Sequence, residues 1–391
     1  MVEKGNVLKL AERAETSVRL EMKDISEISE HIVKANTDTV RFFGRTVSDI
    51  QEDRVYFNWT CSGFEFTFTG ISAEALLLTD IRQDRKIAEF GARAHIGVYV
   101  DGQTEAVTDF LLDEERKWYT LAQNLPYGNH TIRVVKLSEV GYGRSAVMKI
   151  KVMGLEDIRP TLPKNRRLEF IGDSITCGYG NICTTKSPDF ITWEENGYRT
   201  FAAFIAQEFE AEANFISVSG TGVFHDYGMN THNLIPELYG YTDKMLYEHY
   251  GKPAKAWNFE NYIPDLIVMR LGQNDSRYCE GWDRAEEERT EDIFHSRRKE
   301  FKEKYQEFLL KIITFNPNIL ILCHFDNSMS LKYEIKEAIE EIQKKNSQVH
   351  YIELPEKSME EGVGANGHWS VCTHRRAANT LSAKIREITG W

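Results

Sequence analysis

The sequence predicts a β-sandwich, of jelly-roll type, followed by a three-layer α/β/α domain built on a parallel sheet. In the first half of the chain, short runs rich in aromatic and β-branched residues follow one another without helical segments between them. After Pro163 the pattern changes, and apolar strand-like runs alternate with segments of helical length. Strands that alternate regularly with helices predict a parallel sheet covered on both faces.

Length and composition set the class of protein. The chain has 391 residues, of which 41% are hydrophobic, so it can fill the cores of two domains. Lysine and arginine number 48 against 60 aspartates and glutamates, a net charge of −12. This charge repels phosphate backbones and anionic lipids, so we expect neither a nucleic-acid partner nor a membrane partner.

The sequence also bears on location and on thiol chemistry. The amino terminus lacks an apolar run like that of a secretory signal, and no stretch is long enough to span a bilayer, so we expect a cytoplasmic protein. Its cysteines include no Cys-x-x-Cys pair, a pattern that favours free thiols over disulfides or a zinc site. They are Cys61, Cys177, Cys183, Cys279, Cys323 and Cys372.

The expected sandwich occupies residues 31–158, preceded by an arm or short helix over residues 1–30, which are polar and helix-prone. Period-two or aromatic-rich runs predict its strands, and turn-forming residues such as Asp101-Gly102 and Pro126–Asn129 separate some of them. The clearest strands are Thr39–Phe43, Val55–Trp59, Phe64–Phe68, Ala75–Thr79, Ile96–Val100 and His130–Lys136.

Pro160 and Pro163 suit a connection between domains, because proline cannot donate to a strand ladder. The α/β domain is expected over residues 159–391. Its predicted strands are Leu168–Ile171, Phe215–Val218, Leu266–Leu271, Ile319–Cys323 and His350–Leu354. Apolar periodicity predicts the helices Arg199–Phe209, Arg298–Phe315, Lys332–Lys345 and His374–Ile388.

The first of these strands runs directly into Gly172-Asp173-Ser174, followed by a helix start. A serine at this position lies at the mouth of an open α/β sheet, beside helix N–H groups that can stabilise an oxyanion. All three residue types also form ordinary turns. Asp173 is expected to brace the turn by hydrogen bonds.

Three later strand ends carry residues that acyl transfer by a serine requires. The glycines of Ser219–Gly222 let a backbone N–H approach a ligand, or only form a turn. Asn274 can donate its amide to an oxyanion, or cap the following segment. His368 follows a glycine-rich loop and can act as the base, whereas His374, inside the last helix, is expected to be structural. A single histidine is more often a buried structural residue, but four such pieces on one sheet edge favour a common site.

With these residues the chain resembles the SGNH (GDSL-type) hydrolases, whose motif residues would be Ser174, a glycine of Ser219–Gly222 with Gly220 preferred, Asn274 and His368. The earlier segments Val40–Arg45, Tyr127–Thr131 and Val135–Glu139 resemble the sandwich of carbohydrate esterase family 2. The resemblance implies a flavodoxin-like sheet and removal of O-acetyl groups from xylan- or glucomannan-type poly- or oligosaccharides, with no metal or cofactor. It also implies an oxyanion hole formed by the Ser174 and Gly220 N–H groups and the Asn274 amide.

The sequence departs from the family pattern at one position. Many SGNH enzymes carry an aspartate three residues before the histidine, where this chain has Ala365. Some family 2 members are expected to orient the imidazole with a backbone carbonyl or with a residue two positions before it. The matching residue is Asn366, whose main-chain or side-chain carbonyl is predicted to accept the hydrogen bond from Nδ1 of His368.

Candidate substrate-binding residues lie in the loops at the same sheet edge. Sugar recognition favours aromatic faces, which predicts Trp369 first, then Trp257 and Trp193, although most aromatics in such a chain are packing residues. Asp275 and His225 could contact sugar hydroxyls, or lie in solvated loops.

Two other functions use the same residues. A lipolytic or thioester hydrolase would need a wide apolar acyl pocket. A carbohydrate-binding protein with a degenerate hydrolase domain would be consistent with Ala365. The sequence leaves the oligomeric state open.

Overall fold

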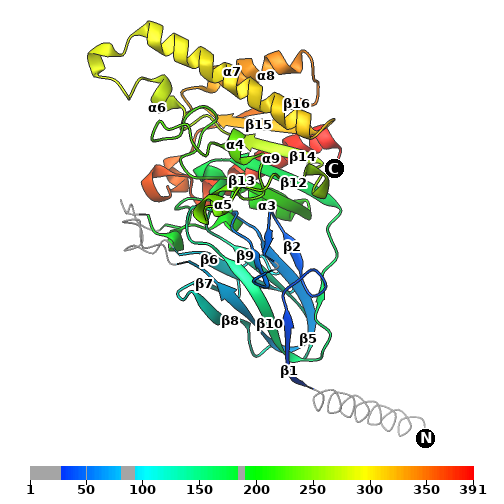
Figure 1. Cartoon of the computed structure of the whole chain (residues 1–391). Helices are drawn as coiled ribbons and strands as arrows, with labels where there is room; N and C mark the ends of the chain where they lie inside the picture. Colours follow the sequence, from blue (N-terminus) through cyan, green and yellow to red (C-terminus); the bar gives the residue numbers. More distant parts are fainter. Residues whose placement is uncertain (1–27, 50, 81–92, 184–189) are drawn as a thin grey trace, which may run out of the picture.

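The computed structural model describes residues 28–49, 51–80, 93–183 and 190–391, which form two adjoining lobes (Figure 1). The predicted arm, residues 1–30, lies almost entirely outside the described residues. Its last residues belong to the first strand, which begins at Ser29.

Antiparallel strands form the amino-terminal lobe. They are β1 (Ser29–Lys34), β2 (Arg41–Phe43), β3 (Val47–Asp49), β4 (Arg54–Tyr56), β5 (Gly63–Leu78), β6 (His95–Val100), β7 (Thr108–Leu111), β8 (Arg116–Ala122), β9 (Gly128–Lys136), β10 (Ala146–Gly154) and β11 (Arg159–Pro160). They enclose an apolar core that includes Phe64, Phe66 and Phe68, whose alternation along β5 places all three rings on one face.

Strand β5 joins the two halves of this lobe. Its first half pairs with β9 and its second half with β8 and β10, so all eleven strands belong to one hydrogen-bonded network. The predicted strands Phe64–Phe68 and Ala75–Thr79 are therefore two parts of one strand, because Gly70 and its neighbours stay extended between them.

The carboxy-terminal lobe contains a parallel sheet of five strands, as the sequence predicted. The strands lie in the order β13-β12-β14-β15-β16. The strands are β12 (Arg166–Gly172), β13 (Ala211–Ser217), β14 (Leu266–Arg270), β15 (Leu320–Asp326) and β16 (Val349–Leu354). Its helices are α2 (Ser174–Cys177), α3 (Phe201–Glu208), α4 (Ile235–Leu238), α5 (Lys244–His249), α6 (Ser276–Cys279), α7 (Glu291–Phe315), α8 (Lys332–Gln343) and α9 (Val371–Thr389).

Helices cover both faces of this sheet, which confirms the three-layer prediction. Helices α7 and α8 pack on one face through residues such as Phe301 and Ile335, and α3 and α9 pack on the other through Phe201 and Leu381. Helix α7 begins seven residues before the predicted Arg298. The added segment lacks apolar periodicity, and its first-turn carboxylates suit the positive end of the helix dipole.

Residues of the antiparallel lobe belong to both hydrophobic cores of the parallel-sheet lobe. Trp59 and Val140 of the antiparallel lobe belong to the core under α7 and α8, and Val135 and Leu137 belong to the core under α3 and α9. The chain passes from one lobe to the other at residues 160–163, but the lobes also contact each other through buried residues far from this connection.

Two further predictions can be compared with the described residues. None of the six cysteines, which all lie in the described ranges, forms a disulfide. Within the described ranges, no helix combines the length and the apolar character that crossing a membrane requires.

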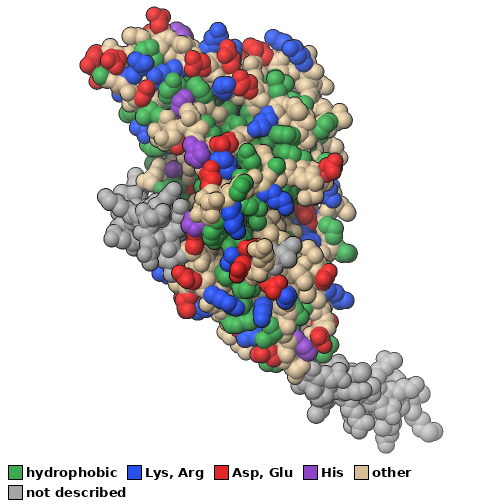
Figure 2. All heavy atoms as spheres, in the orientation of Figure 1, with side chains coloured by type: hydrophobic (Ala, Val, Ile, Leu, Met, Phe, Trp, Pro, Cys, Tyr) green, Lys and Arg blue, Asp and Glu red, His purple; other side chains and the backbone are tan. Residues whose placement is uncertain are grey.

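On the face shown in Figure 2, acidic and basic side chains are interspersed over both lobes.

Candidate active site

Ser174 is the first residue of α2, directly after β12. The Asp173 carboxylate caps this one-turn helix by accepting the Ile175 N–H at 3.0 Å, and it forms a buried ion pair with Arg270. The expected bracing role of Asp173 is therefore confirmed. A larger residue at position 172 would clash with the nucleophile helix, because a Cβ there would lie 2.0 Å from Oγ1 of Thr176.

His368 reaches Ser174 from the loop before α9. Its Nε2 lies 2.9 Å from Oγ of Ser174, and its Nδ1 lies 2.9 Å from the main-chain oxygen of Ala365. Because a carbonyl only accepts, Nδ1 carries the proton and Nε2 faces the serine hydroxyl as an acceptor. The pair is thus arranged for removal of the Ser174 proton.

The acceptor hydrogen-bonded to Nδ1 is the main-chain carbonyl of Ala365, whereas the sequence predicted the main-chain or side-chain carbonyl of Asn366. The Asn366 side chain donates from Nδ2 to the Tyr179 hydroxyl at 3.1 Å, and it makes no contact with Nδ1 of His368. The reason is the tight turn Ala365–Gly367, in which Asn366 is left-handed at φ 51°. This turn brings the Ala365 carbonyl to both the backbone N–H and the ring of His368.

Burial lowers the pKa of His368 to about 4, and the nearby Lys357 and Arg270 cations act in the same direction. The main-chain carbonyls of Ala365 and Asn366 oppose this shift by favouring the protonated ring. The imidazole is therefore neutral, and able to act as a base, over the whole neutral range.

The predicted oxyanion donors converge on the same place. Gly220 (φ 78°) lies in the turn after β13, and Asn274 follows β14, the strands on either side of β12. The Asn274 amide donates from Nδ2 to the Thr221 carbonyl at 2.7 Å, which fixes the amide beside the Gly220 loop. Its second N–H is available to a ligand.

Ser174, Gly220, Asn274 and His368 together line one cleft of about 620 Å³. A cleft of this size accommodates a small ester or a few sugar rings. Its remaining wall is formed by Ile175, Tyr179, Ser219, Tyr227, Arg270, Gln273, Ser328, Lys357, Asn366, Gly367 and Trp369.

Only one of the predicted substrate-binding residues lines this cleft. Trp369 does so, but it is 5% exposed and packs against Phe201 and His374, so it contributes an edge of the wall and no open stacking face. The sequence did not single out Tyr227, which is 58% exposed at the cleft with Arg277 against its ring. Its signal in the sequence was that it is an aromatic residue in the loop after a predicted strand.

The prediction that Asp275 contacts substrate is wrong. Its carboxylate is fully buried and accepts the backbone N–H groups of residues 223–225. Burial raises the pKa of Asp275 to about 6 against these N–H donors. His225 is also buried and stacks on Tyr278 at 3.6 Å, so neither residue lines the cleft.

Trp257 and Trp193 lie outside the cleft as well. Trp257 packs against the buried Arg45 guanidinium at 4.7 Å, and Trp193 stacks on His95 at 4.8 Å. Both rings therefore pack at the junction of the two lobes and do not face the cleft. His374 has the expected structural role, since its Nδ1 accepts the Phe201 N–H.

Sequence reasoning missed Arg270, the last residue of β14. Its buried guanidinium pairs with Asp173 and Asp326 and lies 5.0 Å from the centre of the Trp369 ring. It therefore joins the ends of three strands at the wall of the cleft. A lone arginine closing an apolar strand was its only signal.

Within the described residues, the one group of side chains with the donor set and spacing of a metal site is Glu139, Cys177 and Glu195. It lies outside the cleft and contains neither Ser174 nor His368.

Comparison with known proteins gives matches over both lobes. Residues 42–161 match the carbohydrate esterase 2 N-terminal family, and residues 168–381 match the GDSL-like lipase/acylhydrolase family. The two models divide the chain near its proline-containing connection.

Individual relatives match most of the chain. The chain is 26% identical to the cellulase/esterase CelE of Acetivibrio thermocellus over 85% of its length, but covers only 38% of CelE. It is 22% identical to an acetylxylan esterase/glucomannan deacetylase of Cellvibrio japonicus, covering 93% of this chain and 92% of that protein. A family two carbohydrate esterase from Clostridium thermocellum, solved with cellohexaose, aligns with a TM-score of 0.75 at 26% identity over 90% of this chain and 99% of that one.

Proposed function

Because the chain belongs to the GDSL-like lipase/acylhydrolase family and carries a carbohydrate esterase 2 N-terminal region, we propose that it is a serine esterase that removes O-acetyl groups from acetylated oligosaccharides. The observation that carries the proposal is the 2.9 Å contact between Oγ of Ser174 and Nε2 of His368, at a cleft that Gly220 and Asn274 also line.

Acylation begins when Oγ of Ser174 attacks the acetyl carbonyl carbon while Nε2 of His368 takes the hydroxyl proton. The carbonyl oxygen becomes an oxyanion, which accepts from the Ser174 and Gly220 N–H groups and from the Asn274 amide. His368 then returns the proton to the departing sugar oxygen, leaving an acetyl group on Ser174.

Deacylation repeats these steps with water as the nucleophile. His368 takes a proton from water, the same donors bind the second oxyanion, and Ser174 leaves with the proton as acetate is released. The imidazolium formed in each half is stabilised by the neutral Ala365 carbonyl. A neutral acceptor stabilises this charge less than a carboxylate does, so we expect a slower enzyme than one with a full triad.

The proposed substrate class draws on the relatives, which are described as acetylxylan esterases and glucomannan deacetylases. We therefore propose xylan- or glucomannan-type oligosaccharides, with the exposed ring of Tyr227 at the cleft available for sugar contact. We propose a cytoplasmic location as well, and with it imported oligosaccharides as the substrates. The proposal includes a jelly-roll domain over residues 31–158 and a catalytic domain over 159–391.

Replacing the nucleophile tests the reaction. Ser174→Ala removes the attacking oxygen, so the release of 4-nitrophenol from its acetate ester should fall at least about 10³-fold, while thermal unfolding stays cooperative. Turnover retained by a folded Ser174→Ala variant would contradict the nucleophile assignment.

Acyl length separates the proposed acetyl esterase from a lipolytic or thioester hydrolase with the same residues. Esters of 4-nitrophenol from acetyl to octanoyl should show kcat/KM falling sharply beyond propionyl. Activity that rises with chain length would favour the lipolytic function.

A further inference from the structure

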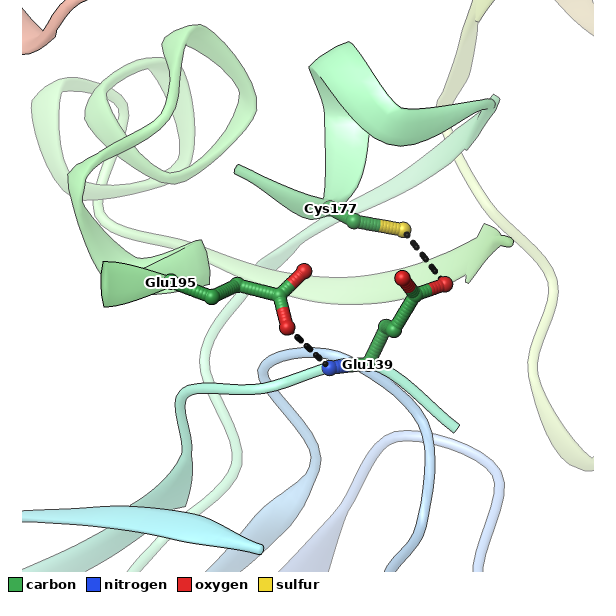
Figure 3. A group of neighbouring side chains, drawn as sticks. All are labelled: Glu139, Cys177 and Glu195. Atoms are coloured by element: carbon green, nitrogen blue, oxygen red, sulfur yellow. Dashed lines mark hydrogen bonds between the residues drawn. The ribbon is translucent and has the colours of Figure 1, made fainter. Parts of the chain in front are cut away.

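Three polar side chains are buried together where the antiparallel lobe meets the hydrolase lobe (Figure 3). Glu139 comes from the segment after β9, Cys177 is the last residue of α2, and Glu195 precedes α3. Figure 3 shows the Cys177 thiol and the Glu195 carboxyl pointing toward Glu139. We refer to these three residues as the junction cluster.

Glu139 connects this cluster to the active site. Its Oε2 accepts the backbone N–H of Ser219 at 2.6 Å and lies 3.6 Å from Sγ of Cys177. Ser219 directly precedes Gly220, and Cys177 lies three residues after the nucleophile in the same one-turn helix. One carboxylate from the antiparallel lobe therefore contacts both the oxyanion loop and the nucleophile helix.

The oxyanion loop is held from two sides. On its downstream side, the Gly220 carbonyl accepts the Tyr227 N–H at 2.7 Å, and the Thr221 carbonyl accepts from Asn274. On its upstream side, the Ser219 N–H is bound by Glu139. A short hydrogen bond to a carboxylate is stronger than one to a neutral acceptor, so Glu139 is suited to fix the Gly220 peptide.

Glu139 is itself held rigidly. The buried ammonium of Lys136 donates to the main-chain oxygens of Asn58, Glu139 and Gly143, closing the turn that presents the Glu139 side chain. The Glu139 backbone N–H donates to the Glu195 carboxyl at 3.1 Å. Burial raises the pKa of both Glu139 and Glu195, whereas the Ser219 N–H and the Lys136 charge favour the ionised form of Glu139.

We propose that Glu139 is a positioning residue for catalysis: the antiparallel lobe supplies the carboxylate that sets the oxyanion loop and the nucleophile helix relative to each other. The inference rests on the proposed esterase function. It assigns the amino-terminal lobe a part in transition-state stabilisation, which requires donors already placed where the negative charge develops.

The same cluster could be considered a cation site, but its contacts favour the positioning role. Oε2 of each carboxylate already accepts a backbone N–H, and the Lys136 ammonium lies close enough to stabilise the Glu139 carboxylate. Oε1 of each carboxyl group is buried without a hydrogen-bond partner, but a divalent ion bound there would lie near the Lys136 ammonium, which repels it.

The test compares substitutions of Glu139 in the full chain, with 4-nitrophenyl acetate as substrate. Glu139→Leu removes the acceptor at similar volume, so kcat should fall about 10- to 100-fold with KM changed less than about 2-fold. Glu139→Gln keeps an oxygen that can accept the Ser219 N–H, so it should restore kcat to within about 3-fold of wild type. Glu65→Leu is the matched control, because it removes a largely buried carboxylate of the same lobe that pairs with Arg41 and Arg133 and not with Ser219 or α2; the kcat of the folded variant should equal that of wild type.

If Glu139→Leu does not fold, Glu139→Asp replaces it, since this variant keeps the charge but withdraws the acceptor by one methylene; it should show the same loss in kcat. An active wild type with an unchanged kcat in the folded Leu or Asp variant would overturn this inference alone. A wild type without esterase activity would instead overturn the proposed function on which the inference rests. One tightly bound divalent metal per chain, whose removal abolishes wild-type activity, would also overturn the positioning role.

Discussion

At the scale of residues, the candidate chemistry depends on one hydrogen-bonded chain from Oγ of Ser174 through His368 to the Ala365 carbonyl. The sequence could predict the serine and histidine because each follows an apolar strand at the same sheet edge. It could not identify the acceptor, because a main-chain carbonyl belongs to every residue and leaves no compositional signal. The acceptor depends on the turn Ala365–Gly367 alone.

Asn366→Ala distinguishes the main-chain acceptor from the predicted side chain. Because the Asn366 amide contacts Tyr179 and the Ala365 carbonyl contacts Nδ1, kcat/KM should stay within about 3-fold of wild type. The check is steady-state hydrolysis of 4-nitrophenyl acetate. A loss of 100-fold or more in a folded variant would show that the Asn366 side chain orients the base.

The acid limb of the pH profile tests the environment of His368. Only the neutral imidazole can accept the Ser174 proton, and burial lowers its pKa to about 4. Lowering this pKa extends activity toward acid, so kcat/KM should be flat from pH 7 to about 5 and half-maximal near pH 4. Circular dichroism at each pH controls for unfolding. An acid limb centred near 6.5 in folded protein would contradict the buried, neutral base.

At the scale of elements, the five parallel strands could be predicted because each is a short apolar run followed by a helix-length segment. Two other features depend on tertiary structure and could not be predicted from the local sequence. Strand β5 is continuous because its two halves find partners in β9 and β10, and the polar start of α7 is helical without an apolar stripe.

The loop that carries His368 contacts the segment just after the nucleophile helix at Gly180. The Gly180 carbonyl accepts the Ala365 N–H, and a Cβ on Gly180 would lie 2.2 Å from Cβ of Ala365. Gly180→Ala should therefore displace the Ala365 carbonyl and lower kcat at least about 10-fold.

Gly251→Ala is the matched control for this substitution. Both glycines have positive φ, at +59° and +61°, but a Cβ on Gly251 meets no atom within 4 Å. The two variants share the backbone strain, and only Gly180→Ala adds a clash at the site. Equal kcat values for the two variants would contradict the docking role of Gly180.

At the scale of the whole molecule, the two lobes are joined through buried contacts, because side chains of the antiparallel lobe belong to both cores of the parallel-sheet lobe. This explains two wrong predictions. Trp257 and Trp193 are near strand ends in sequence, but their rings are used at the junction of the lobes. Aromatic residues in loops near strand ends can line the cleft or pack between the lobes, and the sequence alone does not distinguish these two positions.

Arg45 tests how tightly the lobes are joined. Its fully buried guanidinium donates to the Tyr239 and Tyr241 carbonyls and pairs with the buried Glu169. Arg45→Met leaves that carboxylate without its cation, so the free energy of unfolding should fall by about 3–5 kcal/mol. Urea denaturation measures the change.

Lys34→Met is the control for Arg45→Met. It removes one side of the exposed Lys34–Asp53 pair and should cost less than about 1 kcal/mol. Equal losses in the two variants would mean that the buried pair contributes no more to the junction than a surface pair does.

Acetate release from acetylated xylan and mannan oligosaccharides, followed by NMR at each ring position, is the most direct test of the proposed function. We expect wild-type protein to release acetate stoichiometrically from at least one ring position, and Ser174→Ala to release none. Binding of the acetylated sugars without release of acetate by the wild type would contradict the account and favour a carbohydrate-binding protein.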